Sequence, residues 1–164
     1  MILSKKCRKL SMLSNDLFEC IIKNTPLVSI DLIVKNGKGE ILLGLRKNEP
    51  AKGFWFVPGG RIFKDESIAN AFKRISENEL GIEYNIGQSK FLGVYEHFYD
   101  NNVFNDDFST HYIVMGFEIS LEDVPKGMKV QHEAYRWFDV ETLLRDPMVH
   151  RYTKNYFLDG KGIR

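Results

Sequence analysis

The sequence predicts a single α/β domain in which a mixed β-sheet lies between layers of α-helix. Three observations support this fold class. Short runs of apolar and β-branched residues end at glycine or asparagine turns, one segment of helical length has both a start and a stop signal, and strand-like and helix-like segments interleave. The chain has 164 residues, of which 43% are hydrophobic, so one domain can bury a substantial core.

The strands are predicted from the apolar runs. Residues 26–34 and 40–45 flank the turn at residues 36–39, which contains Asn36 and two glycines, and this pattern is typical of a β-hairpin. Residues 54–57 form a short apolar run that leads into a predicted turn at Pro58, Gly59 and Gly60. Further strands are predicted at residues 91–98, 110–119 and 134–138.

The main helix is predicted over residues 66–80, because Asp65 is a suitable N-cap residue and Gly81 suits the turn that ends a helix. Two shorter helices are predicted at residues 140–145 and 151–158, where they would close the sheet. The polar loop at residues 100–107 separates two predicted strands and is the best candidate for a mobile lid that faces a substrate.

The domain is predicted to span residues 12–164, because Met12 is an alternative start and residues 1–11 are interpreted as an N-terminal extension. This extension is basic but lacks the apolar run of a secretory signal. No apolar run has the length of a membrane span, and a net charge of +1 provides no field that favours nucleic acid. Two cysteines are too few for a disulfide framework, so we expect reduced thiols and a cytoplasmic protein.

The spacing of charged residues and glycines around the main helix indicates phosphate chemistry. Gly60 is followed after five residues by Glu66, after seven more by Arg74, and then by Glu79 and Gly81. This frame resembles the box of the Nudix family, G-x5-E-x7-R-E-U-x-E-E-x-G-U, where U is a bulky aliphatic residue. The resemblance implies a Nudix fold and a substrate that carries a nucleoside diphosphate.

Two carboxylates of the family pattern are absent from this box. Ile75 and Asn78 stand where the pattern has glutamates, and Ser76 replaces an aliphatic residue. Glu79 is then the one strong anionic ligand left on the helix, so we expect one Mg²⁺ ion per active site, with Mn²⁺ as an alternative. The resemblance adds the carbonyl oxygen of Gly59 as a ligand.

Longer phrases are similar to one group within the family, the GDP-mannose mannosyl hydrolases. They fall at residues 25–31, 55–61, 96–100, 110–112 and 131–137, and the same two box carboxylates are replaced in that group. The resemblance implies hydrolysis of GDP-mannose, with GDP-glucose as a second candidate. Water would attack the anomeric carbon with inversion, and GDP and free sugar would leave. It also implies a homodimer and a role in polysaccharide biosynthesis.

The same resemblance implies roles for individual residues. His132 would be the general base, and Gln131 would join Glu79 and Gly59 around the ion. Arg46 and Arg61 would stabilise the leaving GDP, and Asp31 and Tyr112 would place the substrate. Phe18 would contact the base or another subunit, and His97 would contact the substrate or support the structure. Glu66 and Arg74 would hold the loop before the helix. Asp31 also stands out by itself, because a carboxylate inside an apolar strand requires a partner or a function.

Two other functions remain open at this point. An ordinary Nudix pyrophosphohydrolase would release a nucleoside monophosphate and a sugar phosphate. A nucleotide-sugar sensor would bind without turnover, which the two absent carboxylates could favour.

Overall fold

A computed structural model describes residues 13–104, 107–122 and 132–163, with the backbone alone for His132 and Glu133. Its centre is a seven-stranded mixed sheet with the order β3-β2-β1-β6-β5, in which β4 also pairs with β1 and β7 with β2. The β1–β6 pair is parallel and the other pairs are antiparallel. The predicted fold class is therefore confirmed. The strands are β1 (Leu27–Lys35), β2 (Ile41–Arg46), β3 (Trp55–Phe56), β4 (Gly59–Arg61), β5 (Lys90–Tyr99), β6 (Thr110–Ser120) and β7 (His132–Phe138).

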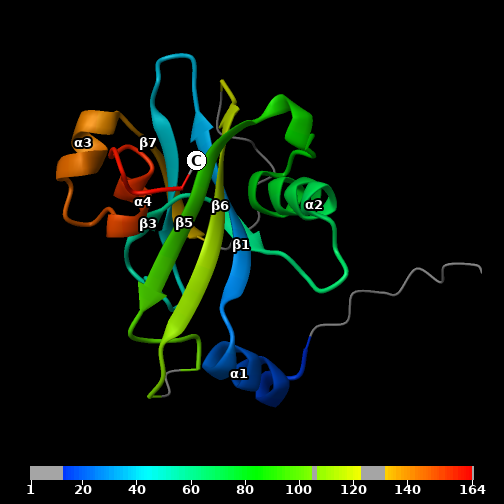
Figure 1. Ribbon diagram of the computed structural model, residues 1–164. Helices are drawn as coiled ribbons and strands as arrows, with labels where there is room; N and C mark the ends of the chain where they lie inside the picture. The colour runs from blue at the N-terminus through cyan, green and yellow to red at the C-terminus, as the bar shows by residue number, and fades with distance from the viewer. Residues whose placement is uncertain (1–12, 105–106, 123–131, 164) are drawn as a thin grey trace, which may run out of the picture.

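Helices cover both faces of the sheet (Figure 1). Helix α2 (Ile68–Leu80) lies against one face, and α3 (Val140–Arg145) and α4 (Arg151–Asn155) lie against the other. A further helix, α1 (Asn15–Asn24), lies at one end of the sheet, and a 3₁₀ turn, η1 (Ile86–Gln88), follows α2. Each described helix is too short or too polar to cross a membrane.

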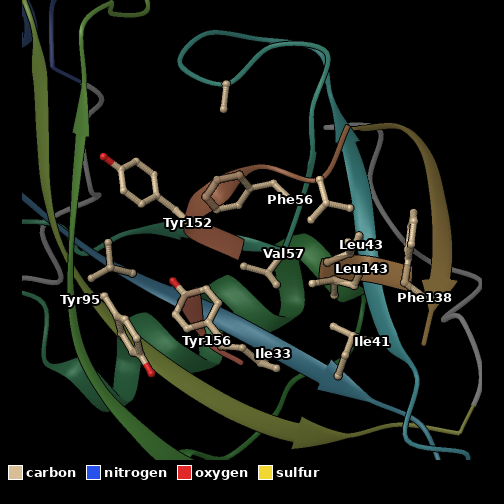
Figure 2. Packing of buried hydrophobic residues seen from close by; sticks show 13 residues of the cluster. Ile33, Ile41, Leu43, Phe56, Val57, Tyr95, Phe138, Leu143, Tyr152 and Tyr156 are labelled. Carbon is tan, nitrogen blue, oxygen red and sulfur yellow. The ribbon is translucent and has the colours of Figure 1, made fainter. Parts of the chain in front are cut away.

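The alternation of side chains along β1 divides the core into two clusters. Ile30, Leu32 and Val34 point to one side, where they pack with α2 residues such as Phe72. Ile33 belongs to the second cluster, with residues of α3 and α4 (Figure 2). Asp31 has the same parity as Ile33, so its side chain is directed toward the α4 layer.

Helix α2 begins two residues later than predicted. Ser67 is the N-cap residue, and its Oγ accepts a hydrogen bond from Asn70 N at 3.2 Å. Asp65 instead adopts a left-handed conformation with φ 63°, and the Glu66 carboxylate is occupied by other donors, described below. The predicted end was right, because Gly81 has φ 70° and its N–H donates to the Glu77 carbonyl.

Several other boundaries differ from the predictions. Gly59 and Gly60 do not form a free turn, because they begin β4 and pair with Asp31 and Ile30 of β1. Helix α4 ends at Asn155 and is shorter than residues 151–158, since the N–H of Tyr156 bonds back in a tighter turn. The hairpin and α3 agree with the predictions, whereas α1 and η1 were not predicted.

Strands β1 and β2 separate soon after their shared turn. The two strands pair next to the turn, where Lys35 lies opposite Ile41. Farther from the turn, β4 pairs with β1 and β3 pairs with β2. Side chains from these diverging strands and from α2 line the space that the separation leaves.

Candidate active site

A cavity of about 380 Å³ lies where β1 and β2 diverge. Strands β1, β2, β4, β5 and β6 and helix α2 all contribute to its walls. It brings together side chains that are far apart in the chain but were predicted to share a site: Asp31, Arg46, Arg61, His97 and Tyr112. The two predicted metal ligands that the structure describes, Gly59 and Glu79, line the same cavity.

The cavity lining found among the described residues does not include three predicted site residues, Gln131, His132 and Phe18. Gln131 lies outside the described residues. His132 is described by its backbone, which pairs with Arg46 of β2. Phe18 contacts the site indirectly, because the guanidinium of Arg61 lies 3.9 Å from the centre of its ring. Helix α1 therefore supports a cavity residue through a cation–π contact.

Helix α2 presents one carboxylate to the cavity. Glu79 is buried, with 4% of its surface exposed, and it lines the cavity beside Asn78. Ile75, one turn earlier, is fully buried and packs beneath Gly60, where an added Cβ would stand 3.2 Å from Ile75 Cγ1. The residue that replaces a family glutamate is therefore part of the core.

The backbone at Gly59 has no room for a side chain. A Cβ atom at this position would stand 2.5 Å from Asp31 Oδ1 and 2.7 Å from the Ile30 carbonyl oxygen. Both distances are shorter than a van der Waals contact. The absence of a side chain lets β4 lie close to β1 and keeps the Gly59 backbone at the cavity wall.

The donor chemistry of this wall fits one hard divalent cation. Glu79 supplies a carboxylate and Gly59 a backbone carbonyl, and Mg²⁺ prefers such oxygen ligands. Within the described residues, no group of three or more histidine, cysteine or acidic side chains is arranged to hold a metal. The charge of Glu79 acts on its surroundings, because burial and this charge together raise the pKa of Tyr135 to about 12.

Glu66 and Arg74 hold the segment between β4 and α2, as predicted. Arg74 Nε donates to Glu66 Oε1 at 2.7 Å, and Arg74 Nη2 donates to the Arg61 carbonyl oxygen at 2.8 Å. Phe63 N donates to Glu66 Oε2 at 3.0 Å. Burial alone would raise the pKa of Glu66, but the hydrogen bonds from Arg74 and Phe63 outweigh it and lower that pKa. This network fixes the backbone of Arg61.

Ser76 has a structural role at the position where the family has an aliphatic residue. Its Oγ donates to the Lys73 carbonyl oxygen at 2.9 Å and accepts from Tyr84 N at 2.9 Å. The side chain is fully buried, so both bonds are protected from water. They attach the chain after α2 to the helix.

Asp31 has a buried partner from the C-terminal part of the chain. Tyr156 Oη donates to Asp31 Oδ2 at 2.6 Å. Burial raises the pKa of Asp31 to about 7, while the bond from Tyr156 and the charge of Arg46 act in the opposite direction and the charge of Glu79 adds to the rise. The expectation that this carboxylate has a partner is confirmed.

His97 is a neutral imidazole in the cavity wall. It is 2% exposed and stacks on the ring of Tyr152, with centroids 4.2 Å apart. Burial, with the charges of His150 and Arg151, lowers its pKa to about 3. Its Nε2 has no hydrogen-bond partner among the described residues. His97 can therefore offer a neutral ring to the cavity but no positive charge at neutral pH.

Arg46 and Arg61, the two arginines predicted for the site, enter the cavity from different strands. Arg46, at the end of β2, donates from Nε to the Pro50 carbonyl oxygen at 2.9 Å. Arg61 comes from β4, and burial lowers its pKa, against the opposing effect of Tyr112. Tyr112 has a pKa raised by burial in spite of both arginines. The site thus combines neutral aromatic side chains with the guanidinium groups of Arg46 and Arg61, and with that of Arg74, which is bound to Glu66.

Sequence reasoning assigned no role to two residues of this region, Tyr99, which lines the cavity, and Tyr156, which binds Asp31. Tyr99 belongs to the phrase at residues 96–100, and Tyr156 lies in a segment that was predicted only as a helix. The apolar strand around Asp31 signalled that a partner was needed but contained no indication of which residue it is.

Residues 25–158 match the NUDIX domain family, in agreement with the fold and with the box around α2. The chain therefore belongs to the Nudix hydrolases. Members generally use divalent metal ions such as Mg²⁺. The low-salt glycan biosynthesis protein Agl8 of Haloferax volcanii is 42% identical over 138 residues, which is 84% of this chain and 86% of that protein.

Solved structures share this fold. The MutT protein from Methanosarcina mazei Go1 has a TM-score of 0.64 at 24% identity, with 82% of this chain and 92% of that chain covered. The MutT NUDIX hydrolase from Burkholderia pseudomallei has a TM-score of 0.63 at 27% identity, with 80% and 95% covered.

Proposed function

We propose that this Nudix hydrolase cleaves GDP-mannose at the sugar carbon and releases GDP and free mannose with inversion. The observation that carries the proposal is the content of the cavity. Helix α2 contributes one buried carboxylate, Glu79, and the apolar Ile75, and the guanidinium groups of Arg46 and Arg61 line the same cavity. This arrangement suits a departing diphosphate better than attack at phosphorus, where additional cations favour the approach of a nucleophile.

Arg46 and Arg61 would stabilise the leaving group. As the bond between the anomeric carbon and the diphosphate oxygen breaks, its electron pair stays on that oxygen, and guanidinium donors can bind the developing charge. Their positions are held before reaction, by the Pro50 carbonyl for Arg46 and by the Phe18 ring for Arg61. A divalent ion bound by Glu79 and the Gly59 carbonyl, with Gln131 as a further proposed ligand, would neutralise part of the same charge.

His132 is proposed as the general base. It would take a proton from water while the water oxygen forms a bond to the anomeric carbon, on the face opposite the departing diphosphate. What supports this role is the register of β7, whose His132 pairs with Arg46 at the cavity. Asp31, His97 and Tyr112, all cavity residues, would place the sugar and the leaving group.

The choice of a nucleotide sugar is supported by a relative. Agl8 of Haloferax volcanii is named for low-salt glycan biosynthesis, and the similarity covers most of both chains. Sugars linked to nucleoside diphosphates are the activated forms used to build glycans, so hydrolysis of one would belong to that chemistry. GDP-glucose, which differs from GDP-mannose at one sugar carbon, is the second candidate substrate.

A homodimer is part of this proposal. The apolar side chains of Leu13, Leu17 and Val28 are exposed around α1 and the start of β1. Burial of these side chains against a second copy would remove them from water. Light scattering of the wild type should give twice the chain mass, and Leu17→Lys should reduce it, whereas a monomeric wild type would refute the dimer.

Hydrolysis in ¹⁸O-labelled water tests the reaction. With GDP-mannose and Mg²⁺, we expect GDP as the nucleotide product and the label on mannose. Label on a phosphate, with GMP and mannose phosphate as products, would refute attack at carbon and indicate a pyrophosphohydrolase. Binding of GDP-mannose without turnover would indicate a sensor.

A further inference from the structure

The cavity wall that β5 and β6 form contains a phenol group that the proposed reaction does not use. Tyr99 lines the cavity from the end of β5, and the ring of Tyr112, on the neighbouring strand β6, has its centre 6.3 Å from that of Tyr99. His97 lies two residues earlier on β5 and therefore on the same face of the sheet. His97 and Tyr112 have proposed roles beside the substrate, whereas Tyr99 has none.

The ring of Tyr99 is fixed by its neighbours, but its hydroxyl group is not. The ring centre lies 5.2 Å from that of Tyr152 and 5.6 Å from that of His150. In the part of the chain that the structure describes, Tyr99 Oη makes no hydrogen bond. Tyr152 differs, because its Oη donates to the Phe98 carbonyl oxygen at 2.6 Å and accepts from Phe98 N. A partly buried phenol gains from a partner, so the hydroxyl group of Tyr99 is available to a ligand.

Electrostatic effects indicate which end of the cavity this hydroxyl group faces. Burial raises the pKa of Tyr99, and the charge of Asp31 raises it further, whereas the charge of Arg46 lowers it. Arg61 is among the charges that act on Tyr112 but not among those that act on Tyr99. The phenol is therefore protonated at neutral pH and lies toward the end of the cavity that contains Asp31 and Arg46.

The proposed reaction requires the hexose at this same end. The backbone of His132, the proposed base, pairs with Arg46, so the anomeric carbon that receives the water would lie near Arg46. Guanidinium groups only donate hydrogen bonds, and they suit the oxygens of a diphosphate, which accept them. A hexose hydroxyl group both donates and accepts, as a phenol does. Tyr99 therefore matches the hexose better than it matches the diphosphate.

We infer that the hydroxyl group of Tyr99 binds a hydroxyl group of the hexose and contributes to the selection of the nucleotide sugar. The inference rests on the proposed function, from which it takes the bound hexose. A site with a polar group for one substrate hydroxyl rejects an analogue that lacks this hydroxyl, because the polar group then has no partner. Removal of the phenol oxygen should therefore affect recognition of the hexose and leave the binding of GDP unchanged.

A double-mutant cycle between protein and substrate tests this contact. The protein change is Tyr99→Phe, and the substrate change replaces GDP-mannose by analogues that each lack one hydroxyl group of the mannose. Initial rates give kcat/KM, calorimetry gives the affinity for GDP, and thermal denaturation gives the melting temperature. Tyr84→Phe is the matched control, because its hydroxyl group binds the Ser120 carbonyl oxygen and does not line the cavity. Tyr152→Phe is the structural comparison, because it removes the hydroxyl group that binds the Phe98 backbone.

Tyr99→Phe should lower kcat/KM for GDP-mannose about tenfold, on the scale of one hydrogen bond, without a change in the affinity for GDP. With the analogue that lacks the contacted hydroxyl group, the variant and the wild type should have equal kcat/KM, whereas with the other analogues the difference should remain. The two proteins are compared on the same substrate, so the intrinsic reactivity of each analogue cancels.

A purely structural role predicts a different pattern. Tyr99→Phe should melt no lower than the wild type, because the lost hydroxyl group has no partner among the described residues, whereas Tyr152→Phe should melt lower. Tyr84→Phe should match the wild type in kcat/KM and in GDP affinity. The inference is overturned by an unchanged kcat/KM in Tyr99→Phe, by an equal loss with every analogue, or by weaker binding of GDP.

The proposed reaction fails by a separate observation. Label on phosphate would refute attack at carbon, but the cycle would still test the contact, because kcat/KM is measured from the loss of the nucleotide sugar. If GDP-mannose binds without turnover, its displacement of bound GDP supplies the affinities for the same cycle. If free mannose is released and Tyr99→Phe has no effect, the reaction stands and the role of Tyr99 is wrong.

Discussion

Tyr156, just after α4, donates a 2.6 Å hydrogen bond to Asp31 of β1, and both side chains are buried. The two residues are 125 positions apart in the chain. The bond connects the C-terminal helical layer to the cavity between β1 and β2, because Asp31 lines the cavity and Tyr156 packs in the core with Ile33 (Figure 2). A single hydroxyl group therefore links core packing to the position of a site carboxylate.

Tyr156→Phe should lower the free energy of unfolding by about 1–3 kcal/mol, because a buried carboxylate loses its donor. Chemical denaturation measures this change. Tyr84→Phe is the control, since it removes an exposed hydrogen bond to the Ser120 carbonyl and should cost no more than about 0.5 kcal/mol. In Asp31→Asn the effect of Tyr156→Phe should shrink. Equal effects in both backgrounds would show that the two side chains are not coupled.

Gly59→Ala should destabilise the protein by about 1–3 kcal/mol and reduce turnover, because the new Cβ would collide with Asp31 Oδ1 and with the backbone of Ile30. Backbone cannot move away as a flexible side chain can, so β4 must shift from β1. Gly87→Ala is the matched control, since its nearest contact is Asn85 Oδ1 at 3.4 Å. A Gly59→Ala protein with the wild-type melting temperature and rate would contradict the close approach.

Features encoded within one segment were predictable from the sequence. The spacing from Gly60 through Arg74 to Glu79 identified one helix and one carboxylate, and Gly81 marked the end of that helix. The start was misplaced because Asp65 and Ser67 are both good N-cap residues, and the folded chain uses Ser67.

Contacts between distant segments were not predictable in this way. Nothing near Tyr156 indicates that its hydroxyl reaches Asp31, and nothing near Gly59 indicates that it pairs with β1 as a strand. A hollow of about 460 Å³ on the surface likewise combines residues from three separate segments, such as Glu49, Phe98 and His150. The role of Gln131 stays a prediction, since it lies outside the described residues.

Acid should destabilise the protein through His97. Burial lowers the pKa of His97 to about 3, whereas an unfolded histidine has a value of 6.5. The unfolded state therefore binds the proton more readily, so this contribution to stability is fully present above pH 6.5 and is lost as the pH falls toward 3. Between pH 7.5 and pH 5 the loss is about 2 kcal/mol.

Denaturation of the wild type and of His97→Asn at both pH values measures this contribution. The variant should be less stable at pH 7.5, because its ring no longer stacks on Tyr152, but it should lose about 2 kcal/mol less on acidification. Measurements at pH 7.5 and 8.5 are the control, since His97 is neutral in both states there. Parallel losses in the two proteins would show that His97 is not held neutral.

Glu79→Gln should reduce Mg²⁺-dependent turnover of GDP-mannose by at least about 100-fold, on the scale of removing one group that stabilises transition-state charge. The amide keeps the shape of the side chain but removes the negative charge that favours a divalent cation. Glu77→Gln is a matched control from the same helix, because Glu77 is exposed and does not line the cavity. Binding of Mn²⁺, followed by electron paramagnetic resonance, separates loss of the ion from loss of folding. Glu79→Gln should bind Mn²⁺ weakly and Glu77→Gln should bind it as the wild type does. If both variants bind the ion equally well, the Glu79 carboxylate does not hold the cation. The proposed metal site would then have to be assigned to residues outside helix α2.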